Sequence, residues 1–424
     1  MSLSSDPSRE PCAAPLVSSL LPSLGEAIAT IGSRFTQSGA MGLLLIDASV
    51  MASVEERYGE EAVSRTLGAL GEIVAELAAD RLHVDDVVVA GETGRNEFVV
   101  ILFRESNDSA FVQQELPNFQ RALRSLVEQR KNRVFYPYLR SAPSMPMGTA
   151  VAFRNPKFST QSQLRSALEE ARRDANLNCL LEARDARQSF LQLLLDQQVT
   201  SVYEPIVEVS TKTVFGYESL ARGPEGPFHS PIALFGMAEK QGLVFELDCL
   251  CRRSGLEGAV GLPDGTKLFL NVLPTCIHDP AFRADRLIRT LEASELSPSD
   301  VVFEISEQES IHNFELFKEF RDSYRELGFQ FALDDTGSGY AGLQTLLEIE
   351  PEFIKVDRAF VSGIDLDASR QDMVKALLMM AEKTGARVVG EGLDRIEELE
   401  MLGELGIHFG QGWLFGHPTP LRSG

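Results

Sequence analysis

Cysteine is scarce in this sequence of 424 residues, and its five cysteines follow no paired spacing. They are Cys12, Cys179, Cys249, Cys251 and Cys276. An odd number of scattered cysteines is typical of a reducing compartment and argues against a disulfide framework. We therefore expect a cytoplasmic protein.

Long apolar runs are also missing, because no run approaches the roughly 18 residues that a membrane-spanning helix needs. The first fifteen residues lack a basic region followed by an apolar one, so no secretory signal is expected. With 44% hydrophobic and 24% charged residues, the composition is that of a globular protein. The length predicts two or three domains. The lack of a long apolar run predicts no membrane insertion.

Positive charge is outnumbered, with 40 Lys and Arg against 62 Asp and Glu and a net charge of −22. Such a surface repels nucleic-acid polymers and anionic lipid. A small anionic ligand remains possible where cations reverse the local field.

The first half of the chain predicts an α+β domain. Residues 1–35 are expected to form a flexible tail and a lead-in helix, residues 36–185 the domain, and residues 186–200 a linker helix. Within the domain, apolar patterns predict four strands and three helices. The strands are expected at 41–46, 87–90, 98–103 and 148–153, and the helices at 60–82, 113–130 and 163–176.

Residues 201–424 show a different pattern, in which short apolar runs alternate with helical segments. The runs end at Glu218, Asn271, Glu304, Asp334 with Asp335, Lys355 with Asp357, Glu391 and Gln411. With a further strand near Tyr203 there are eight strands, which predicts a TIM-like (β/α)8 barrel of parallel strands. In such barrels the functional groups lie where the strands end, so these polar residues are the candidate site.

Acids brought together at one barrel mouth repel each other unless cations neutralise them. Hard divalent ions with oxygen ligands remove this problem, and the Asn271 amide offers a neutral oxygen. Two such ions suit displacement at phosphorus, where Lys355 can orient or deprotonate a water and Arg222 can bind a phosphate. The residues thus predict metal-assisted phosphoester hydrolysis.

The stretch 203–416 resembles an EAL domain, the family of cyclic di-GMP phosphodiesterases. It carries YEPIV, GYESLAR, FLNV, FEISE, LDDTGSGYAGL, IKVDR, GEGL and GQGWLFGHP. The resemblance implies a barrel that uses two Mg²⁺ or Mn²⁺ ions to cut cyclic di-GMP to linear pGpG, and a homodimer formed through this domain.

The resemblance also implies roles for individual residues. The metal ligands would be Glu218, Asn271, Glu304, Asp334, Asp335 and Glu391. Lys355 would be the general base, acting with Glu218 and with Glu307, which supports the loop after Asp335. The substrate contacts would be Glu204, Leu220, Arg222, Asp357 and Gln411.

Three residues depart from the family pattern. Ser219 replaces Ala in the signature, Thr336 replaces Phe after the paired aspartates, and Glu204 replaces a common Gln near a guanine base. The last two favour an alternative function, a receptor that binds cyclic di-GMP without hydrolysing it. A scaffold in which both domains have lost their activity is a third hypothesis, against which the complete ligand set argues.

Residues 36–185 resemble a damaged GGDEF domain, the family of cyclic di-GMP synthases. Asp47 matches its first metal-binding acid, and the turn Gly94–Phe98 matches its signature. The second acid is replaced by Ser49, the signature acid by Asn96, and the guanine-reading pair by Glu55 and Glu56. The resemblance therefore implies a regulatory domain without catalysis.

Overall fold

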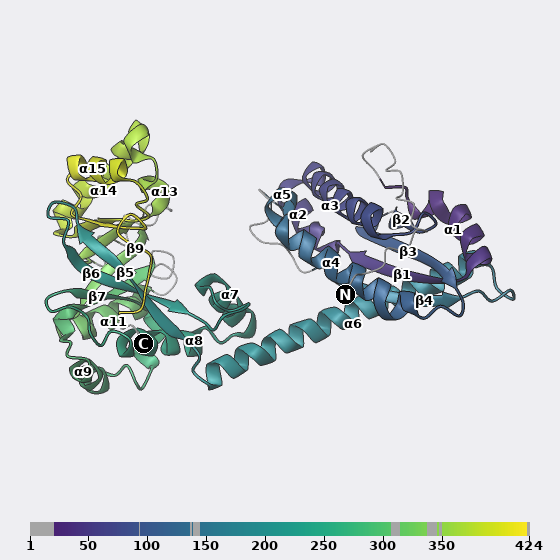
Figure 1. The fold of residues 1–424 in the computed structure, drawn as a ribbon. Coiled ribbons are helices and arrows are strands. Elements are labelled where there is room, and N and C mark those ends of the chain that lie inside the picture. The colour runs from purple at the N-terminus through teal and green to yellow at the C-terminus, as the bar shows by residue number, and fades with distance from the viewer. Residues whose placement is uncertain are drawn as a thin grey trace, which may run out of the picture. The chain divides into compact units, whose positions relative to one another are not determined.

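The computed structural model describes residues 21–92, 94–135, 138, 145–306, 314–336, 346 and 350–421, without the side chains at 131, 132, 314, 335 and 336. The chain divides into two compact units, with the boundary between Ala186 and Arg187 (Figure 1). Within the described ranges, no helix is both long enough and apolar enough to cross a bilayer.

The first unit is built on a four-stranded antiparallel sheet in the order β2-β3-β1-β4. Its strands are β1 (Gly39–Asp47), β2 (Val87–Ala90), β3 (Glu97–Glu105) and β4 (Met147–Phe153). All four strands were predicted from apolar runs. Strands β1 and β3 are buried along nearly their whole length, because helices cover both faces of the sheet.

The helices of this unit form two cores, one on each face. They are α1 (Leu24–Ser38), α2 (Ala52–Tyr58), α3 (Glu60–Arg81), α4 (Leu116–Gln129), α5 (Lys131–Phe135) and α6 (Thr160–Leu195). Alternate residues of β1 enter different cores, as the two-residue period of a strand requires. Leu44 and Ile46 pack with α3 and α4, whereas Leu43 and Leu45 pack with α1 and α6.

Helix α6 is a single element of 36 residues. The sequence pattern predicted a helix at 163–176 and a separate linker helix beginning at 186. No Gly or Pro occurs between Thr160 and Leu195, so nothing in the backbone interrupts the helix at the boundary between the units.

The second unit is a closed barrel in the order β10-β11-β12-β5-β6-β7-β8-β9, which confirms the predicted fold. Its strands are β5 (Thr200–Glu208), β6 (Val214–Arg222), β7 (Lys267–Asn271), β8 (Val301–Ser306), β9 (Gln330–Thr336), β10 (Phe353–Val356), β11 (Arg387–Gly390) and β12 (Phe409–Gln411). Its helices are α7 (Pro231–Gln241), α8 (Val244–Glu257), α9 (Ala284–Ala293), α11 (Phe314–Arg325), α13 (Arg358–Val361), α14 (Ala368–Thr384) and α15 (Ile396–Leu405). Single turns of other helix types are η1 (Ser49–Met51), η2 (Phe111–Glu115), η3 (Pro274–His278), η4 (Pro298–Asp300) and η5 (Ile364–Leu366).

One strand contradicts the expectation of an all-parallel barrel. Strand β5 pairs antiparallel with both of its neighbours, β6 and β12. Only residues 209–213 separate β5 from β6, and a connection this short makes a hairpin, whereas parallel neighbours need a long crossover. As a result, the first half of β5, and not its end, lies at the barrel mouth.

The end of the barrel where the parallel strands begin is filled by side chains. Phe215, Phe353 and Phe409 gather there, and the guanidinium carbon of Arg387 lies 5.0, 4.4 and 5.4 Å from their respective ring centres. Cation–π attraction of this kind favours a charged group above aromatic faces. The barrel is therefore closed at this end, and its site lies at the other.

Candidate active site at the barrel mouth

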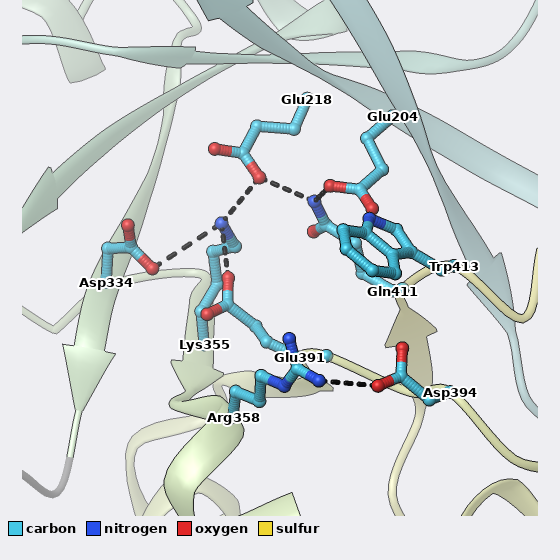
Figure 2. A pocket seen from close by; sticks show the side chains of 11 residues that line it. Glu204, Glu218, Asp334, Lys355, Arg358, Glu391, Asp394, Gln411 and Trp413 are labelled. Carbon is cyan, nitrogen blue, oxygen red and sulfur yellow. Dashed lines mark hydrogen bonds and ion pairs between the residues drawn. The ribbon is translucent and has the colours of Figure 1, made fainter. Parts of the chain in front are cut away.

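Four carboxylates from four different strand ends converge on one buried ammonium group. Lys355, at 1% exposure, is on β10, and Figure 2 shows its amino group among the acids. Its Nζ lies 2.6 Å from Glu391, 2.9 Å from Glu304, 3.0 Å from Glu218 and 3.4 Å from Asp334. The structure thus brings together the residues that the sequence analysis placed at strand ends.

This arrangement keeps Lys355 charged. Burial by itself lowers the pKa of the lysine, but the four surrounding carboxylates outweigh it and hold the pKa well above its ordinary value. A permanently protonated amine donates hydrogen bonds and cannot take a proton from water. The role of Lys355 as a base remains a prediction, and it requires divalent ions to replace the ammonium among the acids.

The acids themselves differ in their electrostatics. Burial raises the pKa of Glu304 and of Glu391, with neighbouring acids adding to the effect. Burial also acts to raise the pKa of Glu218, but Lys355, Gln411 and Asn271 together lower it below its usual range. Glu218 is therefore the acid that the surrounding donors stabilise most as an anion.

Two amide side chains hold these carboxylates from the side. Asn271 donates through Nδ2 to Glu218 at 3.0 Å and to Glu304 at 3.2 Å. Gln411 donates through Nε2 to Glu218 at 2.6 Å and to Glu204 at 3.1 Å. In this arrangement Asn271 acts as a hydrogen-bond donor, whereas the sequence analysis expected its oxygen to be a metal ligand.

A cavity of about 290 Å³ opens above the cluster. Its lining includes Glu204, Glu218, Asp334, Lys355, Arg358, Glu391, Asp394, Gln411 and Trp413 (Figure 2). A second cavity of about 350 Å³ shares Glu218 with the first and is lined by Leu220, Asn271, Glu304 and several apolar side chains. Glu218 thus stands between two spaces that a ligand can occupy.

Three cavity residues were missed by the sequence analysis. Trp413 is 57% exposed, the guanidinium carbon of Arg358 lies 5.9 Å from its ring centre, and Arg358 pairs with Asp394 at 2.5 Å. An exposed aromatic face beside a cation suits the stacking of a planar ligand. The signal was available, because Trp413 is the only tryptophan in the chain and directly follows the Gln411-Gly412 strand end.

Two predicted substrate contacts make other hydrogen bonds in this structure. Arg222 lines neither cavity, and its guanidinium donates to the carbonyl oxygen of Ala221 at 2.9 Å. Asp357 caps helix α13, where its carboxylate accepts from the backbone N–H of Ala359 at 2.6 Å. Glu307 and the side chains of Asp335 and Thr336 lie outside the described residues.

The donor set fits hard divalent cations in its chemistry. It offers carboxylate and amide oxygens only, and the buried Gln411 Oε1 has no hydrogen-bond partner among the described residues. Over the same part of the chain, however, no three His, Cys, Asp or Glu side chains are spaced to share one ion. The acids instead point at Lys355, whose ammonium lies at the centre of the cluster.

Comparison with known proteins identifies the barrel. The family model described as "EAL domain" matches residues 187–418. The probable cyclic di-GMP phosphodiesterase PdeG of Escherichia coli K12 is 30% identical over 228 residues, which are 52% of this chain and 45% of that protein. The cyclic di-GMP phosphodiesterase NbdA of Pseudomonas aeruginosa is 30% identical over 239 residues, 55% of this chain and 30% of that protein.

A solved structure supports the fold alone. The EAL enzyme Bd1971, in its form bound to cAMP and cyclic di-GMP, is 23% identical with a TM-score of 0.52. The match covers 66% of this chain and 80% of that one. The chain spans less than half the length of the two curated relatives, so their activities are not transferred with the match.

Proposed function

This chain belongs to the EAL domain family, and on that basis we propose that it is a metal-dependent phosphodiesterase that hydrolyses cyclic di-GMP to linear pGpG. The observation that carries the proposal is the convergence of Glu218, Glu304, Asp334 and Glu391 on one point at the barrel mouth. The two curated relatives are a probable cyclic di-GMP phosphodiesterase and a cyclic di-GMP phosphodiesterase, which supports this substrate.

In this proposal the acids hold two Mg²⁺ or Mn²⁺ ions, with Asp335 and Asn271 completing the ligand set. When bound, such ions lower the pKa of a water and neutralise the phosphate oxygens. With ions bound, Lys355 would have to leave the centre of the cluster, and it would then be placed to orient or deprotonate the attacking water. Gln411 stays beside Glu218 and offers its free oxygen as an acceptor.

The remaining assignments concern the ligand. Trp413 and Arg358 provide an aromatic face and a cation for one half of the dinucleotide, and Leu220 lines the second cavity. Arg222 and Asp357 contact substrate only if their side chains leave their present hydrogen bonds. Glu307 is proposed to support the loop that follows Asp335.

A product assay tests the proposal directly. Purified full-length protein is incubated with cyclic di-GMP and Mg²⁺ or Mn²⁺, and pGpG is measured by chromatography. We expect turnover that EDTA abolishes and that Glu218→Gln lowers at least about a hundredfold, because the acid beside both cavities is lost. Glu208→Gln, which neutralises an acid at the opposite end of β5, is the control and should retain activity. Absence of turnover with either ion would refute the proposal.

A second function is favoured by one observation. The ammonium of Lys355 lies among the four acids and offsets part of their charge, so the cluster has a cation of the protein's own at its centre. A receptor that binds cyclic di-GMP without cutting it would need no more than this. Calorimetry in EDTA followed by the product assay separates the two functions, since tight binding with no cleavage favours the receptor.

For the first unit we propose a GGDEF-like regulatory domain without catalysis. The register supports this proposal, because Asp47 pairs with Glu97 and brings the signature turn beside the remaining acid. Glu97 is itself bound by Arg172 at 2.5 Å. We further propose a homodimer formed through the EAL domain, which light scattering of the full chain would test.

A further inference from the structure

Glu204 faces a like charge that it should repel. In the antiparallel pairing of β5 with β6, Glu204 lies directly opposite Glu218, so both side chains stand on the same face of the sheet. Burial raises the pKa of Glu204, and Glu218 adds to that effect, while Gln411, Lys355 and Arg222 oppose it. Like charges directly opposite each other destabilise a sheet unless a donor lies between them.

Gln411 is that donor. Its single amide nitrogen donates one hydrogen to Glu218 at 2.6 Å and the other to Glu204 at 3.1 Å (Figure 2). An amide nitrogen has two hydrogens, so both are used. Turning the amide over would put its oxygen against two carboxylates, and the two acids therefore allow only one orientation.

The fixed orientation leaves a buried acceptor. Gln411 is only 4% exposed, and its Oε1 has no hydrogen-bond partner among the described residues. A buried oxygen of this kind costs free energy until a donor reaches it. In the cavity beside Glu218, a water of a divalent ion is a donor of the right chemistry.

From this geometry we propose that Glu204 is a positioning residue for a divalent-ion site, acting through Gln411 to hold the Glu218 carboxylate toward the ion and to keep the amide oxygen free. The inference rests on the proposed function. Glu204 stands at a position where the resemblance to the family predicts Gln. Residues that orient metal ligands in this way typically change metal affinity by about 10–100-fold when they are removed.

The test is the affinity of the full chain for Mn²⁺ alone, measured by electron paramagnetic resonance without any dinucleotide. Glu204→Ala should raise the Mn²⁺ dissociation constant by about tenfold or more, since the amide of Gln411 loses one of the acids that fix it. Glu204→Gln should restore the affinity to within about threefold, because it keeps an oxygen that can accept from Gln411. Glu208→Ala, on the same strand but away from the mouth, should leave the affinity unchanged.

A double-mutant cycle tests the route of the effect. Gln411→Met should reproduce the loss of Glu204→Ala, and the double variant should be no weaker than either single variant. Additive losses would overturn the proposal, as would Mn²⁺ affinity within twofold of the parent in Glu204→Ala. Equal losses in Glu204→Ala and Glu204→Gln would show that charge alone matters and would also overturn it.

These results are independent of the hydrolysis test. Mn²⁺ binding that follows the expected pattern without pGpG formation would refute the phosphodiesterase and leave the positioning role standing. Turnover together with an Mn²⁺ affinity that the Glu204 substitutions leave unchanged would support the phosphodiesterase and refute the positioning role. Melting temperatures of all variants in EDTA report whether a loss of affinity reflects a loss of fold.

Discussion

Removing the ammonium at the centre of the acids should destabilise the barrel strongly. The change is Lys355→Met, which keeps the length and apolar stem of the side chain and deletes its charge. Glu304 is 0% and Glu218 is 6% exposed, so the acids left behind have little access to water. Breaking a buried ion pair by removing one partner costs about 3–5 kcal/mol. We expect a loss of this size in the free energy of unfolding of the barrel in EDTA.

The measurement uses urea, because an uncharged denaturant does not screen the acids as guanidinium would. Trp413 is the only tryptophan in the chain and lies in the barrel, so its fluorescence follows this unit alone. Lys375→Met is the matched control, since Lys375 is exposed and pairs with Asp372 on the surface of α14. An exposed pair contributes about 0–1 kcal/mol.

Divalent cation should reverse the loss. A ligand present at about 100 times its dissociation constant adds about 2.7 kcal/mol to the stability of a protein that binds it only when folded. In Lys355→Met the acids have no competing ammonium, so Mg²⁺ should stabilise the variant more than the parent. A loss below about 1 kcal/mol in EDTA, or no response to Mg²⁺, would refute the reasoning that Lys355 substitutes for a cation.

Three further predictions follow from other contacts. Trp413→Leu should weaken cyclic di-GMP binding by about 1–3 kcal/mol in calorimetry, the usual contribution of base stacking, and Trp413→Phe should recover most of it. Burial and Arg387 lower the pKa of His408, whose ring nitrogen accepts a backbone hydrogen bond. The imidazole therefore binds a proton less readily in the folded barrel than in the unfolded chain. The barrel should lose stability as the pH falls below the pKa that His408 has in the unfolded chain. His408→Gln should reduce this acid sensitivity in urea titrations. Arg172→Met should destabilise the first unit by about 3–5 kcal/mol in calorimetric melting, because Glu97 would remain buried without its partner.

The strand ends were the part of the site that the sequence made predictable. A parallel barrel gathers the ends of its strands at one mouth, so Glu218, Glu304, Asp334, Lys355 and Glu391 could be placed together from pattern alone. Their geometry around the ammonium could not be predicted in the same way. Which atoms meet depends on side-chain rotamers and burial, and these are not encoded by position along the strand.

One strand direction and two side-chain orientations could not be predicted, and the causes are equally local. The direction of β5 was missed because its apolar run looks the same in either direction, and only the short connection to β6 forces a hairpin. Asp357 follows a strand and precedes a helix, which makes it a strong N-cap, and the structure shows it in that position; its contact with substrate stays a prediction. Arg222 was assigned from its charge and its place after Glu218 as well as from the family resemblance, and none of these reports which way its guanidinium points; its contact with phosphate stays a prediction.

The aromatic side chains at the end of the barrel opposite its mouth have a kinetic consequence. Phe215, Phe353 and Phe409 with Arg387 fill the barrel interior at the end where its parallel strands begin, so the described cavities lie at the mouth. Under the proposed function, substrate and product would both use the mouth beside Trp413, so bound product would block the next substrate. If the proposed hydrolysis takes place, we therefore expect the cleaved product to inhibit the reaction competitively.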